Sequence, residues 1–315
     1  MTRQWLRKLN LTVEGGGKTL DLSELRVRFI VQQELQRQRP AVAQITISNL
    51  SDDTANAINK EGKIVSLSAG YEDGFGQIHK GEIYQKRGPA RETPVDKYLV
   101  LNSKSGDTAY SYAVVNKSLA AGHTYRDQVD VALEAMKPFG ITAGFIADLG
   151  SQKMPRGRAL FGMARDVLRT VAQSTNSAWT IRDQKLEIVK NDKAMEGQAF
   201  VLNSQTGMIG MPVQTTGGIQ VRMLLNPKVR PGTRLKIDQA SIQRAALNQD
   251  YFNPVELQQL VLPSIAADGF YKVLYLEHSG DTRGTAWYTD CACVATSEQG
   301  LVLANFAKQG IPTDV

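Results

Sequence analysis

Alternating apolar and polar residues dominate the first 120 positions of the chain, and this period of two predicts β-strands. Turns rich in glycine, proline and aspartate separate the alternating stretches. One short helix is predicted at residues 51–62, because Ser51 can cap its first turn and Gly62 follows its last one. The predicted strands are residues 9–13, 25–33, 43–50, 63–71, 77–85 and 97–103.

The spacing of apolar residues changes to that of helices after residue 120. Thr124 and Asp127 stand in capping positions for a helix that ends at Pro138. A second helix is predicted over residues 157–175, where apolar residues recur every three or four positions. The predicted strands of a closing hairpin are residues 178–183 and 185–190. This middle block is predicted to be a small α/β domain.

Strand periodicity returns in the last third of the chain. The predicted strands there are residues 218–225, 233–239, 269–278 and 285–295. Residues 240–265 form an insertion between the second and third of these strands, and the end of the chain has little pattern. The predicted fold class is mainly β with an α/β insert, in which two β-barrel domains flank a helix-plus-hairpin domain. The predicted domains are residues 1–120, 121–205 and 206–315.

The first and last blocks share an order of features. In each, an alternating strand leads to an asparagine and a connection, then to a glycine with a second strand, then to a Gly-Phe pair with a third. This order suggests, as a hypothesis, two related β domains that flank the α/β insert.

Composition and charge narrow the class of protein. The chain has 315 residues, of which 42% are hydrophobic and 22% charged, enough for two or three domains with cores of their own. No apolar run approaches the roughly 18 residues of a membrane helix, and the start lacks the apolar core of a signal peptide, so we expect the protein to stay in the cytoplasm until assembly. The net charge of +6 is scattered along the sequence, which favours solvated faces and protein contacts over a nucleic-acid site.

Residues 277–293 gather a histidine, two aspartates and two cysteines, which invites a metal site. Such a site needs about four ligands at suitable spacing, and the chain holds neither a second cysteine pair nor a His-x-x-x-His motif. Convergence of His278 with the thiols of Cys291 and Cys293 stays open as the less favoured alternative. The period of two instead predicts a hairpin whose polar residues face different ways, with both cysteines as free, buried thiols.

Two other stretches suggest a phosphate loop and a general acid, but a structural role is favoured for both. Residues 15–19 read Gly-Gly-Gly-Lys-Thr, yet Thr12 stands where a phosphate loop needs glycine and the next stretch alternates like a strand, so a hairpin is favoured. Glu82 lies near His79 in sequence but on the opposite strand face, which favours an exposed charge over a general acid. We predict no catalytic residue, no metal and no cofactor.

The last block resembles baseplate hub proteins of contractile-tailed bacteriophages. The resemblance is carried by a Leu-Asn-Pro…Pro-Gly approach, a Gly-Phe strand, and a His-x-Gly-Asp-Thr turn that leads to tryptophan. The middle hairpin and the strands of the first block are similar to the hub pattern as well. The matching positions are Leu225, Asn226, Pro227, Pro231, Gly232, Gly269, Phe270, Val273, His278, Gly280, Asp281, Thr282 and Trp287.

The resemblance implies a structural protein of the virion tail. It implies a homotrimeric ring with two tube-like β-barrels per subunit, so that three copies present six similar units to a six-fold tail tube and a three-fold face to the central spike. The implied partners are the tail tube protein, the spike protein, the tape-measure protein and baseplate wedge proteins, with DNA passing only in transit. The middle block and the insertion then serve spike or neighbour contacts.

Two alternatives stay open. One is a tail-tip hub that also cleaves peptidoglycan, against which the absence of a recognisable catalytic pair or spare domain in the sequence speaks. The other is the equivalent tip protein of a non-contractile tail or of a secretion-system spike.

Overall fold

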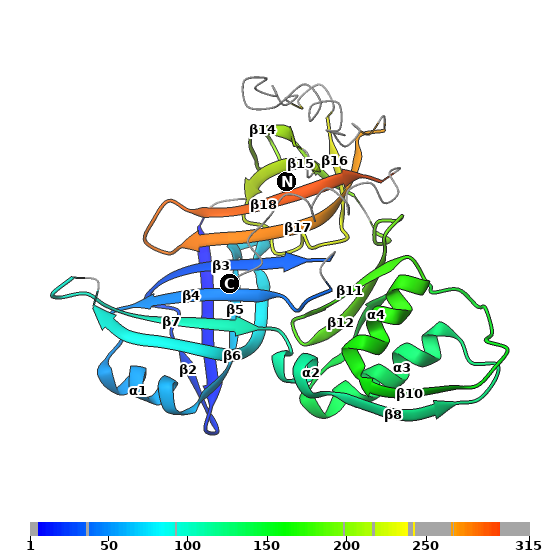
Figure 1. Ribbon diagram of the computed structural model, residues 1–315. Coiled ribbons are helices and arrows are strands. Elements are labelled where there is room, and N and C mark those ends of the chain that lie inside the picture. The colour runs from blue at the N-terminus through cyan, green and yellow to red at the C-terminus, as the bar shows by residue number, and fades with distance from the viewer. Residues whose placement is uncertain are drawn as a thin grey trace, which may run out of the picture.

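The computed structural model describes residues 6–35, 38–91, 93–197, 199–215, 218–238, 242, 266 and 268–296. Most of the insertion predicted at residues 240–265 and the chain beyond residue 296 lie outside the described residues. Strands form a long curled sheet, and helices α3 and α4 lie together in the middle block (Figure 1). The prediction of a mainly β fold with an α/β insert is confirmed. No described helix is long and apolar enough to cross a membrane.

The bounds of the elements fall into three groups. The strands of the main sheet are β1 (Arg7–Gly15), β2 (Lys18–Asp21), β3 (Arg26–Glu34), β4 (Val42–Ser48), β5 (Gly62–Tyr71), β6 (Gly76–Arg91), β7 (Lys97–Lys104), β13 (Phe200–Leu202), β14 (Met208–Thr215), β15 (Gly218–Leu224), β16 (Arg234–Ile237), β17 (Phe270–Asp281) and β18 (Trp287–Ala295). The strands of the middle block are β8 (Val114–Leu119), β9 (Thr142–Ile146), β10 (Arg158–Met163), β11 (Ser177–Arg182) and β12 (Lys185–Lys190). The helices are α1 (Asp52–Glu61), α2 (Asp107–Tyr112), α3 (Tyr125–Met136) and α4 (Ala164–Ser174), with 3₁₀ turns η1 (Glu72–Gly74) and η2 (Lys137–Phe139).

The first and last blocks join in one sheet of 13 strands. Within it, the run β5-β6-β7-β4-β3 of the first block has the same order as the run β16-β17-β18-β15-β14 of the last block, and every neighbouring pair in both runs is antiparallel. The flanks differ, because β1 pairs antiparallel with β5 whereas β13 pairs parallel with β16. The order of five strands therefore repeats, while the strands beside each run do not.

Three large hydrophobic cores support this arrangement. One lies under the sheet of the first block, one between the helices and sheets of the middle block, and one under the sheet of the last block. Leu225 and Trp287 come from the last block but are buried in the core of the first. The boundary between the two β blocks is thus crossed by side chains as well as by strand pairing.

Local sequence signals in the first two blocks are confirmed. Residues 15–18 close the β1–β2 hairpin, in which Gly15 lies opposite Lys18 and both central glycines have positive φ, as a two-residue turn of type I′ requires. Thr124 and Asp127 form the predicted capping box of α3. The predicted hairpin at residues 178–190 is β11–β12.

The predicted start of the second long helix is wrong. Residues Arg158–Met163 form β10, antiparallel to β8, and α4 begins at Ala164. Leu160 and Ala164 are both buried and lie four residues apart, so their spacing matched a helix. Phe161, however, is 82% exposed beside the buried Leu160, which is the alternation of a strand.

Candidate functional site at the β3–β17 junction

The two β blocks meet where β17 pairs with β3. β17 pairs with β16 through Phe270–Lys272, then continues past it and pairs along the same side with β3 over seven residue positions, from Tyr275 opposite Glu34 to Asp281 opposite Arg28. β18 occupies the other side of β17. A single strand therefore belongs to both blocks, which Figure 1 shows as β17 lying directly beside β3.

The turn after β17 is bound to the start of β3. The Arg26 guanidinium donates to both carboxylate oxygens of Asp281, at 2.7 Å from Nη2 and 3.3 Å from Nε, and this pairing holds the pKa of Asp281 below its usual range. Thr282 donates its N–H to the Val27 carbonyl and accepts from the Val27 N–H through Oγ1. The turn thus extends the strand pairing by one further residue.

Trp287 anchors the hairpin in the core of the first block. Its side chain is 1% exposed and packs edge-to-face against Phe29, with ring centroids 5.5 Å apart. Its indole Nε1 donates to the Gly70 carbonyl at 3.2 Å. The Arg7 guanidinium lies 5.6 Å from the indole centroid and donates to the carbonyls of Gly284 and Thr285, so β1 also holds the turn.

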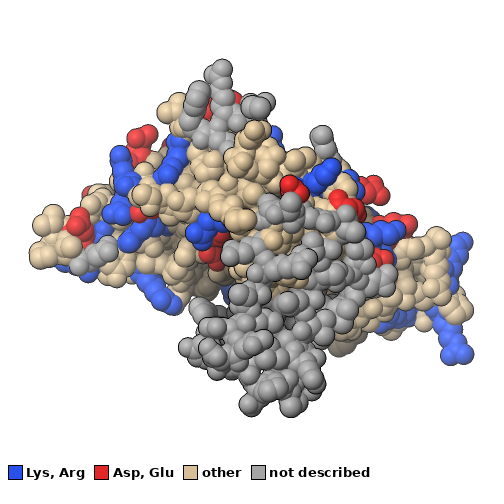
Figure 2. Space-filling model, turned by 90° about the horizontal axis from the view of Figure 1, so that it is seen from above, with Lys and Arg blue, Asp and Glu red and all other residues tan. Residues whose placement is uncertain are grey.

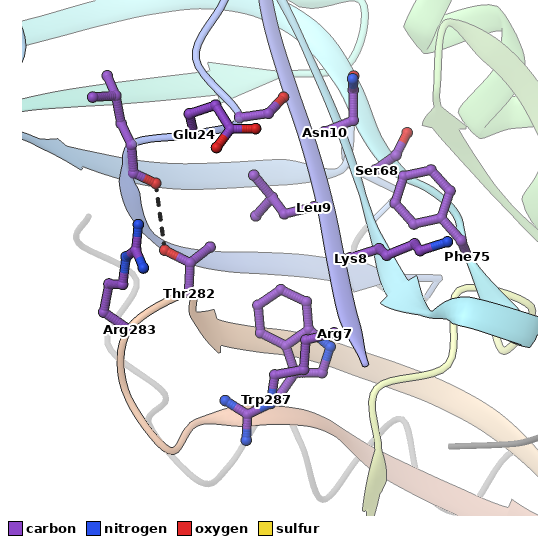
Figure 3. A pocket seen from close by; sticks show the side chains of 12 residues that line it. Arg7, Lys8, Leu9, Asn10, Glu24, Ser68, Phe75, Thr282, Arg283 and Trp287 are labelled. Atoms are coloured by element: carbon purple, nitrogen blue, oxygen red, sulfur yellow. Dashed lines mark hydrogen bonds between the residues drawn. The ribbon is translucent and has the colours of Figure 1, made fainter. Parts of the chain in front are cut away.

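Gly280 allows the close approach of these rings. A Cβ atom at this position would lie 2.4 Å from the Phe29 ring and 2.9 Å from the Trp287 ring, far inside normal contact distance. Figure 3 shows Trp287, Arg7 and Thr282 around an open pocket of about 560 Å³ between β1 and the hairpin. Arg7 and Thr282 are already engaged in the hydrogen bonds described above, so the pocket is bounded by the contacts that fix the junction.

His278 is part of a buried hydrogen-bond chain rather than a metal ligand set. Its Nδ1 lies 2.8 Å from the Thr289 hydroxyl, which also accepts from the backbone N–H of Asn226 at 3.1 Å. Burial lowers the pKa of His278 to about 3, so the imidazole is neutral near pH 7 and the Thr289 hydroxyl can donate to it. Among the described residues, no group of three histidine, cysteine or acidic side chains is placed to hold a metal.

Asn226 and Pro227 lie near the junction. The Asn226 side chain accepts from the Lys228 N–H at 3.0 Å, and Pro227 packs 3.3 Å from where a Cβ of Gly76 would stand. These contacts place the approach to β16 against the first block.

The remaining family-pattern residues lie at the far end of β17, away from the junction. Pro231 and Gly232 are buried, and the Gly232 N–H donates to the Val273 carbonyl at 2.7 Å. Gly269 has a φ of +71° and precedes Phe270, whose ring is covered by the Arg234 guanidinium at 4.9 Å. The residues of the family pattern thus divide between the junction and the far end of β17.

The two cysteines and the two other sequence candidates have structural roles. Cys291 and Cys293 are free and buried, as predicted, and burial raises the pKa of both thiols. His79 is buried with Nε2 2.9 Å from the Ser103 hydroxyl. Glu82 is half-buried and accepts from the Thr108 N–H, so it caps α2, a helix that the sequence patterns did not predict.

The middle block is bound to both β blocks. The Ala41 N–H donates to the Ile181 carbonyl, and Arg230 of the last block lies 3.5 Å from the buried carboxylate of Glu187. Lys272 of β17 is also buried and donates to the Lys190 carbonyl, and burial lowers its pKa to about 8. On the face seen in Figure 2, basic and acidic side chains are mixed rather than gathered in one patch.

Sequence reasoning missed Arg7, Arg26 and Phe29 as parts of the junction. Each lies in a predicted strand or at its edge, but nothing in the local pattern links those strands to residues 280–287. The turn itself was marked by the alternation on both sides of it and by the family pattern around Gly280, Asp281 and Trp287, but neither signal identifies β3 as its partner.

Solved structures of low identity share this fold. The 43 kDa tail protein of prophage MuSo2 from Shewanella oneidensis aligns with a TM-score of 0.58 and 8% identity, covering 92% of this chain and 97% of that one. A tail protein from Neisseria meningitidis MC58 aligns with a TM-score of 0.56 and 10% identity, covering 96% and 99%. The E. coli c3393 protein is a component of the type VI secretion system with structural similarity to T4 tail proteins gp27 and gp5. It aligns with a TM-score of 0.54 and 8% identity, covering 91% of this chain and 76% of that one.

Sequence comparison identifies the family. No curated protein sequence matches the chain. The family described as baseplate hub gp41 matches residues 9–257, which is most of the chain. The protein therefore belongs to the baseplate hub gp41 family.

Proposed function

We propose that the chain is the structural hub of a contractile phage tail, where three copies form a ring between the six-fold tail tube and the three-fold central spike. The family membership supports a component of the virion tail. In this proposal the hub is not an enzyme, is assembled in the host cytoplasm, and contacts tube, spike, tape-measure and wedge proteins. The ring encloses the channel through which DNA passes.

The observation that carries the proposal is the repeated strand order. The runs β5-β6-β7-β4-β3 and β16-β17-β18-β15-β14 give each chain two β units of the same connectivity. A ring of three chains then presents six such units, which is the number that a six-fold partner requires, while its true symmetry stays three-fold. The division into three domains is part of this proposal, although β8 and β13 pair with strands beyond the predicted boundaries at residues 120 and 205.

The β3–β17 junction supports the same proposal by fixing the two units within one chain. Seven paired residue positions, the Trp287 anchor and the Arg26–Asp281 ion pair leave little freedom between the blocks. Units that dock on a ring of fixed spacing need this fixed relation. We infer that the junction sets the angle between neighbouring units of the ring.

Mass measurement tests the proposal. The purified chain is analysed by mass photometry and sedimentation, alone and with the spike protein of the same phage. We expect a species of three times the chain mass of 34.6 kDa. A chain that stays monomeric even with the spike present contradicts the ring.

A second candidate is the equivalent hub of a secretion-system spike. It is favoured by the fold shared with the E. coli protein and with a chain of a Francisella PdpA–VgrG complex. The latter aligns with a TM-score of 0.52 and 6% identity, and the alignment covers 93% of this chain and 58% of that one. Finding genes for a sheath and a capsid near the gene of this chain would favour the phage tail over the secretion system. The peptidoglycan-cleaving alternative is tested by a zymogram of the purified protein, in which clearing contradicts a purely structural hub.

A further inference from the structure

Strands β6 and β17 hold the same place in the two blocks. Each pairs through its first residues with β5 or β16 and then continues past that strand. Each also carries a one-residue bulge just beyond this point, at Tyr84 in β6 and at Leu274 in β17. Counting from these two bulges, residues 85–87 of β6 correspond to residues 275–277 of β17, and a second shift in β6 between Arg87 and Ala90 ends the one-to-one match.

The corresponding stretches differ in what lies beside them. Residues 275–281 of β17 have β18 on one side and β3 on the other. Residues 83–91 of β6 have β7 on one side, and no described strand pairs with the other. β14, which corresponds to β3, pairs with β15 on one side and with no described strand on its outer side. One edge is therefore open in each block, and these are the edges that correspond to the two halves of the β3–β17 junction.

Side-chain exposure follows the same pattern. Leu274 is 7% exposed, and its carbonyl accepts from the Leu35 N–H just past β3. Its counterpart Tyr84 is 47% exposed. On β14, Met211 is 59% exposed in the region that corresponds to Phe29, which is 2% exposed. Large apolar side chains thus stand in solvent at both open edges, where their counterparts are buried.

We infer that β14 of one copy pairs antiparallel with the outer part of β6 in the next copy, in the register that β3 and β17 use within one chain. This inference rests on the proposed ring and names its interface. Three such contacts and the three junctions within the chains give six equivalent joints around the ring. The contact is head-to-tail, because a different strand is used on each side.

The two edges also limit wrong pairing. Pro89 in β6 and Pro212 in β14 each lack a backbone N–H, and β14 carries a bulge beside its proline. Asn59 of α1 donates to the Gly88 carbonyl, so part of the β6 edge is already occupied. We therefore centre the contact on Arg87 and Thr215, which correspond to the paired residues Glu277 and Gln32.

Engineered disulfides test this register. Arg87→Cys and Thr215→Cys are placed in one full-length chain, and oxidised samples are analysed by non-reducing gel electrophoresis, with the spike protein added if the trimer needs it. The native cysteines Cys291 and Cys293 are buried and do not compete. The matched control is Gln32→Cys with Glu277→Cys, which is expected to form a disulfide within one chain because these residues lie directly opposite each other.

The outcomes separate the two proposals. We expect the double variant to form covalent trimers, and an equimolar mixture of the two single variants to stop at covalent dimers. A trimer by mass that gives no Arg87–Thr215 cross-link overturns this interface and leaves the ring in place. Self-cross-linking of the Arg87→Cys variant alone shows β6 pairing with β6 and overturns the head-to-tail contact. No trimer under any condition overturns both.

Discussion

Replacing Gly280 by alanine is expected to destabilise the junction through steric overlap. The added methyl carbon would lie 2.4 Å from the Phe29 ring, whereas carbon atoms in contact are separated by about 3.5–4.0 Å. Phe29 cannot simply turn away, because its ring packs against Trp287 at 5.5 Å in a buried core. Overpacking of this kind costs about 1–3 kcal/mol, and we expect the upper end because both rings are held.

A second substitution tests whether overlap with Phe29 is the cause of the destabilisation. Phe29→Leu removes the atoms that the methyl group meets and by itself costs roughly 1–3 kcal/mol, because it leaves a cavity beside Trp287. If overlap is the cause, the double variant Gly280→Ala, Phe29→Leu loses less free energy of unfolding than the two single variants lose together, by at least about 1 kcal/mol.

Urea unfolding followed by far-ultraviolet circular dichroism measures these differences. Gly74→Ala is the matched control, because a Cβ there meets no atom within 4 Å. A Gly280→Ala variant within about 0.5 kcal/mol of the native chain, or strict additivity in the double variant, would falsify the steric argument.

Three further predictions concern the ionisable groups. Because the folded-state pKa of His79 and of His278 is about 3, against 6.5 for an exposed imidazole, the unfolded chain binds more protons between these values and stability falls as the pH drops below 6.5. At pH 5 the free energy of unfolding is lower than at pH 7.5 by about 2 kcal/mol per histidine. The free energy of unfolding of a His→Gln variant should therefore depend less on pH over this range, and the same pH dependence as in the native chain contradicts the prediction. Arg26→Ala is expected to cost only about 0.5–1 kcal/mol in the same urea assay, because the arginine side chain is 46% exposed, and a loss above about 2 kcal/mol contradicts this. Both cysteine thiols are expected to react with Ellman's reagent only when the chain is unfolded, since both are buried; rapid reaction of the native protein is the opposing result.

Local sequence patterns predicted those features whose determinants lie a few residues apart. The β1–β2 hairpin follows from two adjacent glycines, and the start of α3 follows from Thr124 and Asp127 at capping distance. The hairpin of β17 and β18 follows from alternation on both sides of a turn. In each case the interacting groups are neighbours in sequence, so the pattern contains the partner.

The junction could not be predicted in that way. Alternation along residues 25–33 shows that the stretch has a buried and an exposed face, but it does not identify which strand lies beside it. Arg26 and Asp281 are 255 residues apart, and only folding brings their side chains together. The helix predicted from residue 157 failed for a related reason, because pairing with β8 decided between two periods that the apolar residues alone fitted equally well.

The shared strand β17 also has a consequence for synthesis of the chain. Gln32 meets Glu277 across the junction 245 residues later, so β3 leaves the ribosome long before its second neighbour exists. At about 5–20 residues per second, the outer edge of β3 waits roughly 12 to 50 seconds for its partner. During that time Ile30, still 41% exposed in the finished fold, lies on an unpaired strand edge that another nascent chain can bind. Expression at high ribosome density should therefore favour aggregates nucleated by the first block.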